Sequence, residues 1–284
     1  MKIPFTKMQG IGNDYIYVNC MSGEYFDPAE LSVKMSPRHM SIGADGLVLI
    51  CSSDTADAKM RMFNADGSEG RMCGNAIRCV GKYLYENGIV DKINISVETL
   101  SGIKYLTLTV ENGKVSYVSV DMGTASFVPC KIPVVSESEL INAPITVPSG
   151  GYRFTAVTVG NPHAVIYADE IDSLDLYKIG PEFENNELFP ERINTEFVKV
   201  ISDTHLQMRV WERGSGETWA CGTGACAVVA ASVKNGICSA NTEITVTLIG
   251  GDLKITCSDD YRLTMRGAAV KVYDGVFDTD DFDI

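Results

Sequence analysis

The sequence has few basic side chains and little histidine. Lys and Arg number 24 against 37 Asp and Glu, so the formal net charge is −13. Nucleic-acid binding depends on Lys and Arg side chains that neutralise phosphates, so this balance argues against nucleic-acid or polyphosphate partners. Much of the acid lies near the chain end, where it need not describe a binding site: Asp274, Asp278, Asp280, Asp281 and Asp283.

Long apolar runs are also missing. The most apolar stretch, Ala225–Val233, is far shorter than the roughly 20 residues that span a bilayer. The first residues, MKIPFTKM, lack the apolar region of a secretory signal. Hydrophobic residues make up 45% and charged residues 21% of the 284, so a substantial core is possible. We therefore expect a soluble, cytoplasmic protein with no membrane partner, built as two ordinary domains or one large domain.

Cysteine is present in quantity, but not in a pattern typical of disulfides or zinc. The number is odd, no CxxC pair occurs, and only three histidines accompany the cysteines. These features disfavour a disulfide framework and a structural zinc site, and most of the cysteines are expected to be small buried hydrophobes. The nine are Cys20, Cys51, Cys73, Cys79, Cys130, Cys221, Cys226, Cys238 and Cys257.

One pattern occurs twice at a constant distance. The stretch MRMFNADGSEGRMCGNA begins at Met60 and the stretch MRVWERGSGETWACGTGA begins at Met208, 148 residues later. The same distance separates Cys73 from Cys221 and Asn13 from Asn161. A constant offset of about half the chain predicts two similarly folded halves.

Each half is expected to combine short strands with one long helix. Helices are predicted over Pro28–Met35, Gly74–Tyr85, Ser173–Tyr177 and Thr223–Lys234, with a loop over Glu182–Leu188. The helix after Cys221 is apolar on nearly every face, as is typical of an enclosed helix. We predict an α+β fold of two pseudo-symmetric domains, residues 1–122 with 267–284 and residues 123–266. Each would be a curled, mainly antiparallel, barrel-like sheet around a central helix, with the site between the halves and a mobile acidic tail after Tyr273.

Cys73 and Cys221 each precede a predicted helix. Unpaired N–H groups and the partial positive charge at a helix N-terminus stabilise a thiolate and bind anions. If the halves face each other, one thiolate could remove the α-proton of a bound carboxylate while the opposite thiol protonates the other face, inverting that carbon. A lone cysteine at a helix start more often serves packing, but the repeat favours catalysis. Backbone amides that could hold the carboxylate are those of Gly74, Asn75, Gly222 and Thr223.

Polar residues gather in the loops near these cysteines: Asn13, Asn64, Asn75, Asn161, His163, Asn194, Glu212 and Arg213. Asn in turns usually satisfies the local backbone. The planar fork of Arg213 suits a carboxylate and Glu212 could bind an ammonium, so the pair predicts a clamp for a zwitterion. The alternative is a solvated ion pair on a loop. His163 could tune a thiolate or only fill a turn.

Several of these segments resemble the diaminopimelate epimerases. The matching segments are Met8–Asp14, Phe63–Glu69, Cys73–Asn75 with Arg78-Cys79, Gly160–His163, Glu212–Gly214, Gly216–Thr218, Ala220–Ala225 and Tyr273–Gly275. The resemblance implies interconversion of LL- and meso-diaminopimelate in lysine and peptidoglycan precursor synthesis, without pyridoxal phosphate, another cofactor or a metal. It implies Cys73 and Cys221 as base and acid, His163 and Glu212 as groups that adjust the thiol pKa values, and a homodimer with Tyr273 at the contact. Substrate would be held by Asn13, Asn64, Gly74, Asn75, Asn161, Asn194, Glu212, Arg213, Gly222 and Thr223.

Two positions depart from the family pattern, and two other functions compete. Gln9 stands where many members have His, and Gly46 stands where others have a Gln that can contact substrate, so Gly46 is given no ligand role. A proline or hydroxyproline racemase would also use two cysteines, but it needs no site for a distal zwitterion. A non-catalytic protein could instead bind a small ligand or a thiophilic metal, or sense redox state.

Overall fold

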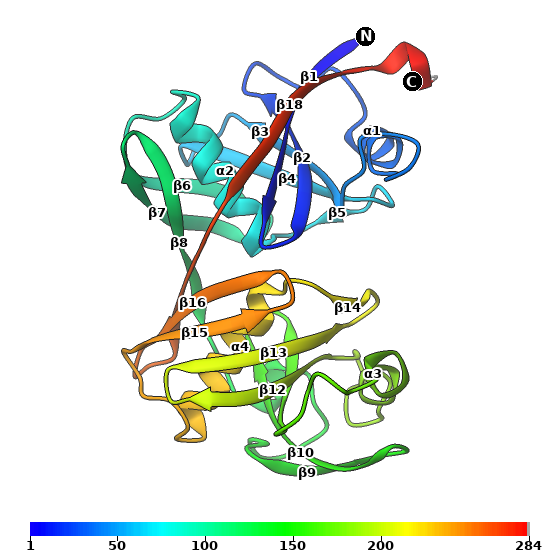
Figure 1. Ribbon diagram of the computed structural model, residues 1–284, viewed down its shortest axis with the longest axis vertical. Helices are drawn as coiled ribbons and strands as arrows, with labels where there is room; N and C mark the ends of the chain where they lie inside the picture. The colour runs from blue at the N-terminus through cyan, green and yellow to red at the C-terminus, as the bar shows by residue number, and fades with distance from the viewer. Residues whose placement is uncertain (283–284) are drawn as a thin grey trace. The chain divides into compact units, whose positions relative to one another are not determined.

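The computed structural model describes residues 1–282, and the chain divides into two compact units (Figure 1). One unit holds Met1–Val120 and the segment that begins at Gly267, and the other holds Asp121–Arg266. The division thus falls after Val120 and after Arg266, beside the predicted 122 and 266. The α+β class is confirmed, because strands predominate and four α-helices accompany them among residues 1–282.

The first unit contains two α-helices, α1 (Pro28–Met35) and α2 (Gly74–Glu86). Its strands are β1 (Lys2–Gly10), β2 (Asn13–Cys20), β3 (Gly46–Cys51), β4 (Ala58–Asn64), β5 (Glu69–Gly70), β6 (Asn94–Thr99), β7 (Gly102–Glu111), β8 (Lys114–Thr124, which runs into the second unit) and β18 (Val270–Asp278). Asp27 caps α1, because its carboxylate accepts from the N–H groups of Ala29 and Glu30. Helix α2 packs against β1, β2 and β7.

The second unit repeats this order with α3 (Leu176–Glu184) and α4 (Gly222–Lys234). Its strands are β9 (Ala143–Val147), β10 (Gly150–Thr158), β11 (Pro162–Tyr167), β12 (Asn194–Ser202), β13 (His205–Glu212), β14 (Gly216–Thr218), β15 (Glu243–Leu248), β16 (Gly251–Cys257) and β17 (Arg262–Gly267). Residues Ala225–Ala231 of α4 are fully buried, since the helix packs against β10, β11, β12 and β16.

Strand register repeats with the same 148-residue offset as the sequence. Strands β2 and β3 are parallel, as are β11 and β12, whereas β4–β5 and β13–β14 are antiparallel pairs. Equivalent partners are Tyr15–Gly46 with His163–Asn194, Leu47–Phe63 with Thr195–Trp211, and Phe63–Glu69 with Trp211–Glu217. The equivalent ion pairs Arg61–Glu69 and Arg209–Glu217 both have an Nε–Oε1 distance of 2.8 Å.

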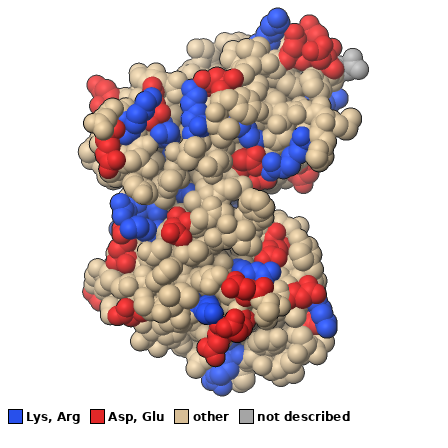
Figure 2. Space-filling model, viewed as in Figure 1, with Lys and Arg blue, Asp and Glu red and all other residues tan. Residues whose placement is uncertain are grey.

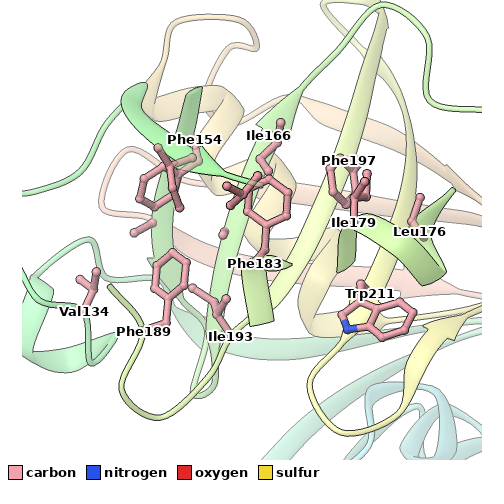
Figure 3. Close-up of a cluster of buried hydrophobic side chains, with 14 of the residues drawn as sticks. Val134, Phe154, Ile166, Leu176, Ile179, Phe183, Phe189, Ile193, Phe197 and Trp211 are labelled. Carbon is pink, nitrogen blue, oxygen red and sulfur yellow. The ribbon is translucent and has the colours of Figure 1, made fainter. Parts of the chain in front are cut away.

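The prediction for α3 was wrong at both ends. The helix begins after Asp175, whose carboxylate accepts from the N–H of Lys178, and it continues to Glu184 instead of ending at Tyr177. Figure 3 shows its apolar side chains within one buried cluster, together with Trp211.

Packing of α3 against Trp211 explains why the helix continues. Gly180 lies so close to the Trp211 ring that an added Cβ would be 2.3 Å from it. The indole Nε1–H of Trp211 donates to Glu184 at 2.7 Å, which holds the last turn. These contacts outweigh the low helix propensity of Gly180 and Pro181.

The prediction of a mobile tail after Tyr273 was also wrong for the part that the structure describes. Strand β18 continues to Asp278 beside β1, and a 3₁₀ turn follows over Thr279–Phe282. The N–H of Thr279 donates to the Met1 carbonyl at 2.8 Å, and the amino group of Met1 lies 2.6 Å from Asp280. Asp283 lies outside the described residues.

Within residues 1–282, no helix is long and apolar enough to cross a membrane. On the face drawn in Figure 2, acidic and basic side chains are interspersed. The cytoplasmic location stays a prediction.

Candidate active site

Cys73 is the N-cap residue of α2. Its backbone is extended, with φ −132° and ψ 121°, and its Sγ accepts from the N–H of Ala76 at 3.5 Å. The Sγ atom also lies 3.3 Å from Oδ1 of Asn13, whose Nδ2 donates to Asp45 at 2.7 Å. A half-buried sulfur at a helix N-terminus is in a position that favours its thiolate.

Asn75 joins this group, whereas Asn64 is held elsewhere. Asn75 is buried in the first turn of α2; its Nδ2 donates to Asn13 Oδ1 at 3.5 Å and its Oδ1 accepts from Arg78 at 3.0 Å. Asn64 is exposed at the end of β4 and donates to Oγ of Ser68, in the following turn, at 2.9 Å. Gly74, also buried, opens α2 directly after Cys73.

Cys221 is the N-cap residue of α4, with the same extended backbone. The N–H of Gly224 donates to its Sγ at 3.3 Å, as Ala76 does for Cys73. Oε2 of Glu212 lies 3.2 Å from this Sγ, and Oγ1 of Thr223 lies 3.5 Å from it. The hydroxyl of Thr218 donates to the other oxygen of Glu212. The sulfur of Cys221 is therefore surrounded by one acceptor and two possible donors.

The surroundings of Cys221 disfavour its thiolate. Burial raises the pKa of this thiol well above its ordinary value, and the carboxylates of Glu212 and Glu196 raise it further. Hydrogen bonds from Thr223 and from the N–H of Gly224 act in the opposite direction. Burial and the two carboxylates dominate, so the surroundings favour the protonated thiol of Cys221.

His163 is linked to Cys221 through two intermediate side chains. Its Nε2 lies 3.0 Å from Oδ1 of Asn161, and Nδ2 of Asn161 donates to Oγ1 of Thr223 at 3.3 Å. On the other side of the ring, Nδ1 lies 2.6 Å from Oε1 of Glu196. Both His163 and Glu196 are fully buried. The ring is thus part of a series of hydrogen bonds that reaches Thr223, beside the sulfur of Cys221.

Arg213 is held by Asn194 and by the backbone carbonyl of Glu191. Oδ1 of Asn194 accepts from the backbone N–H of Arg213 at 2.9 Å, and its Nδ2 donates to the Pro162 carbonyl at 2.9 Å. The Arg213 guanidinium donates to the backbone carbonyl of Glu191 at 2.8 Å. Asn194 therefore fixes the start of the loop after β13, which carries Arg213.

Four residues near these two helix ends were not identified from the sequence, namely Asp45, Thr218, Glu196 and Tyr15. The Asn13 amide is held by Asp45, the Glu212 carboxylate is held by Thr218, and Glu196 is paired with His163. The pKa of Tyr15 is raised well above its ordinary value by burial and by Cys73. The 148-residue offset could have identified Tyr15, because Tyr15 is the equivalent of His163 in the first unit. A Glu inside the apolar strand Thr195–Val198 was the available signal for Glu196.

Metal-ligand side chains are not clustered. Among residues 1–282, no three His, Cys, Asp or Glu side chains lie in a group that could hold a metal ion.

Comparisons with known proteins place the chain in one family. The family model described as Diaminopimelate epimerase matches residues 5–128 and 155–272. Proteins named diaminopimelate epimerase from Acetivibrio thermocellus and Methanococcus maripaludis are each 54% identical, over 279 and 276 residues. These alignments cover 98% and 96% of this chain and 99% of each relative.

A solved structure shares the fold at much lower identity. A probable proline racemase from Agrobacterium radiobacter K84 matches with a TM-score of 0.70 and 16% identity, covering 99% of this chain and 94% of its own. At this identity the likeness shows the fold alone. The family-model match and the two relatives decide the family, and the chain belongs to the diaminopimelate epimerases.

Proposed function

We propose that this protein epimerises LL-2,6-diaminopimelate to meso-diaminopimelate, in lysine and peptidoglycan precursor synthesis, without a cofactor. The observation that carries the proposal is 54% identity to proteins named diaminopimelate epimerase over nearly the whole of both chains. Two cysteines with equivalent capping geometry, 148 residues apart, support it from the structure.

In the proposed reaction, Cys73 and Cys221 act on opposite faces of one α-carbon. The thiolate of one cysteine takes the α-proton, which breaks the C–H bond and leaves an enolate-like carbanion. The thiol of the other cysteine gives its proton to the opposite face, so the centre inverts and the two sulfurs exchange protonation states. Helix N-terminal N–H groups stabilise the negative charge as it develops. Titration of the two thiols is then coupled.

Substrate binding follows from the same arrangement. We assign the reacting carboxylate to the amides that open α2 and α4, namely those of Gly74, Asn75, Gly222 and Thr223. We assign the distal amino-acid group to the side chains of Asn13, Asn64, Asn161, Asn194, Glu212 and Arg213. His163 and Glu212 adjust the thiol chemistry, and the Glu212 contact with Cys221 supports this role.

The proposal extends to the fold and the assembly. The repeated register supports two pseudo-symmetric, barrel-like domains, each around its helix. We propose a homodimer that uses the exposed side chains of β18 around Tyr273, because Val272, Tyr273 and Val276 expose 43–60% of their surface. Sedimentation of Tyr273→Ala tests the dimer: a monomeric variant is expected, and an unchanged mass would contradict the contact.

The experiment for the reaction compares three substrates with no added cofactor. LL-diaminopimelate, L-proline and trans-4-hydroxy-L-proline are each incubated with the enzyme, and the isomers are resolved by chiral chromatography. We expect meso-diaminopimelate to form and both prolines to remain unchanged. Turnover of a proline in place of diaminopimelate would favour the racemase alternative. Stoichiometric zinc without turnover of any of the three would favour a binding protein.

A further inference from the structure

Glu196 is a buried acid for which the proposed reaction gives no role. It lies in β12, is fully buried, and has one oxygen 2.6 Å from Nδ1 of His163. Its second oxygen, Oε2, has no hydrogen-bond partner among the described residues. Burying a charged carboxylate with an unpartnered oxygen destabilises the folded state unless the charge is neutralised.

The hydrogen bonds that leave this pair have a direction. Oδ1 of Asn161 can only accept, so Nε2 of His163 must carry a proton and donate to it. Nδ2 of Asn161 donates to Oγ1 of Thr223, which leaves the single hydroxyl proton of Thr223 available to Sγ of Cys221. The order of donors therefore runs from His163 to the sulfur.

That direction fixes the number of protons on the buried pair. With Nε2–H donating to Asn161, the 2.6 Å contact between Nδ1 and Oε1 needs a second proton, either on the ring or on Glu196. Burial raises the pKa of Glu196, in keeping with a carboxyl that holds or shares this proton. In either form the pair is neutral overall, which lowers the cost of burying it.

Loss of that proton would reverse the direction of these hydrogen bonds. Nδ1–H of a neutral ring would then donate to the Glu196 carboxylate, and Nε2 would become an acceptor. The Asn161 amide would have to turn, so that Oδ1 accepts from the Thr223 hydroxyl. Thr223 could then only accept from the thiol of Cys221. The two directions therefore favour different protonation states of the sulfur.

We propose that Glu196 is a positioning residue for Cys221: it holds one buried proton together with His163 and so directs the Thr223 hydroxyl toward the sulfur. The inference rests on the proposed role of Cys221. The titratable groups that surround this sulfur are Glu212 from β13, Glu196 from β12 and, through Asn161 and Thr223, His163 from β11. Val48 stands at the equivalent place in the first unit, so that unit has no counterpart of Glu196.

Nitrogen NMR on His163 tests the proton count without any assay of turnover. The chain has three histidines, so a His39→Gln, His205→Gln variant leaves His163 as the single observable ring. We expect Nε2 to be protonated from pH 6 to 8, together with a strongly deshielded proton between Nδ1 and Glu196. An unprotonated Nε2 with an Nδ1–H tautomer across this range would overturn the proposal.

Alkylation of the two cysteines tests the effect on the sulfur. Iodoacetamide labelling is followed by mass spectrometry against pH in wild type, Glu196→Gln and Glu196→Leu. Both substitutions remove the Glu196 carboxylate, a group that raises the pKa of Cys221. The amide introduced by Glu196→Gln can still donate to Nδ1 and preserve the direction. The isobutyl side chain introduced by Glu196→Leu cannot donate, so the Cys221 profile should lie about one pH unit higher in Glu196→Leu than in Glu196→Gln, the effect of one lost hydrogen bond.

Cys73 in the same molecules is the control, and its profile should stay in place. Equal Cys221 profiles in folded Glu196→Leu and Glu196→Gln, or equal movement at both cysteines, would contradict the proposal. If Glu196→Leu does not fold, the NMR result on intact Glu196 still decides. If the wild type does not epimerise diaminopimelate, the proposed function fails while both of these readouts stay interpretable.

Discussion

The N-termini of α2 and α4 have the same backbone conformation but differ in the side chains around them. In both, an extended cysteine accepts from the N–H three residues later, and the flanking strands pair in the same register. The equivalent residues, 148 apart, are Asn13 and Asn161, Tyr15 and His163, Val48 and Glu196, Asn64 and Glu212, and Asn75 and Thr223.

The difference is concentrated in charge. Two carboxylic acids and an imidazole lie around Cys221, at places where the first unit has Val48, Asn64 and Tyr15. Cys221 is also buried, whereas Cys73 is partly exposed. A repeated scaffold thus provides two thiols with non-equivalent neighbours, and the neighbours of Cys221 raise its pKa. A two-base reaction needs its two groups in opposite protonation states, and unequal neighbours bias which of the two holds the proton.

Removal of either sulfur should have the largest effect. Cys73→Ala and Cys221→Ala are each expected to lower kcat by about a thousandfold or more while the protein stays folded, because the two groups act as one unit. Chiral chromatography measures the loss, and the exposed Cys130→Ala is the control. Epimerisation retained by either single variant would break the equivalence of the two sites.

The next effect concerns binding. Arg213→Ala should raise KM by about 10- to 100-fold, because a charge-assisted bond to the distal carboxylate is lost. Arg153→Ala, an exposed arginine of the same unit, is the matched control. An unchanged KM in Arg213→Ala would contradict the role of Arg213 in binding the distal carboxylate.

Neutralising Glu212 should bring the surroundings of Cys221 closer to those of Cys73. A carboxylate near the sulfur raises the pKa of Cys221, so Glu212→Gln should lower it and shift its alkylation profile down by about one pH unit. Glu217→Gln, on the same hairpin but paired with Arg209, serves as control. No shift, or a shift to higher pH, would show that the acids do not cause the asymmetry.

The smallest effect separates the units by their sensitivity to acid. Asp14 of the first unit has Pro162 as its equivalent in the second. Burial opposes ionisation of Asp14, but Arg38 and Lys7 outweigh it and hold the pKa of this carboxyl below its ordinary value of 3.8. A depressed pKa stabilises the fold above the unfolded value, and this contribution is lost as pH falls through the folded value.

Asp14→Asn should therefore lower the free energy of unfolding by about 1 kcal/mol at pH 7. The deficit should disappear toward pH 2, where wild type has lost the same contribution. Urea unfolding at both pH values measures it. An equal deficit at both would mean that Asp14 contributes through packing and not through charge.

Much of this comparison could be predicted from the sequence, because the repeat is written in local chemistry. Strand–loop–Cys–Gly segments at one offset predicted both capping cysteines and the helices after them. The apolar helix around Ala225–Val233 predicted its own burial.

What the sequence did not predict depends on contacts between distant segments. Helix α3 extends because Trp211 packs on Gly180 and bonds Glu184, a contact that no local propensity encodes. The tail is ordered through β1 and Met1, at the other end of the chain. The role of Glu196 depends on its contact with His163, 33 residues away in the sequence.

Hydrogen exchange during the first turnovers tests the central claim most directly, namely that two different groups handle the proton on the two faces of one carbon. LL-diaminopimelate is epimerised in deuterium oxide, and substrate and product are separated and weighed by mass spectrometry before equilibrium. Because the donating thiol has already exchanged with solvent, the account predicts a product that carries one deuterium while the remaining substrate carries none. Product that keeps the hydrogen of the substrate, or deuterium that enters both at equal rates, would mean that one group serves both faces.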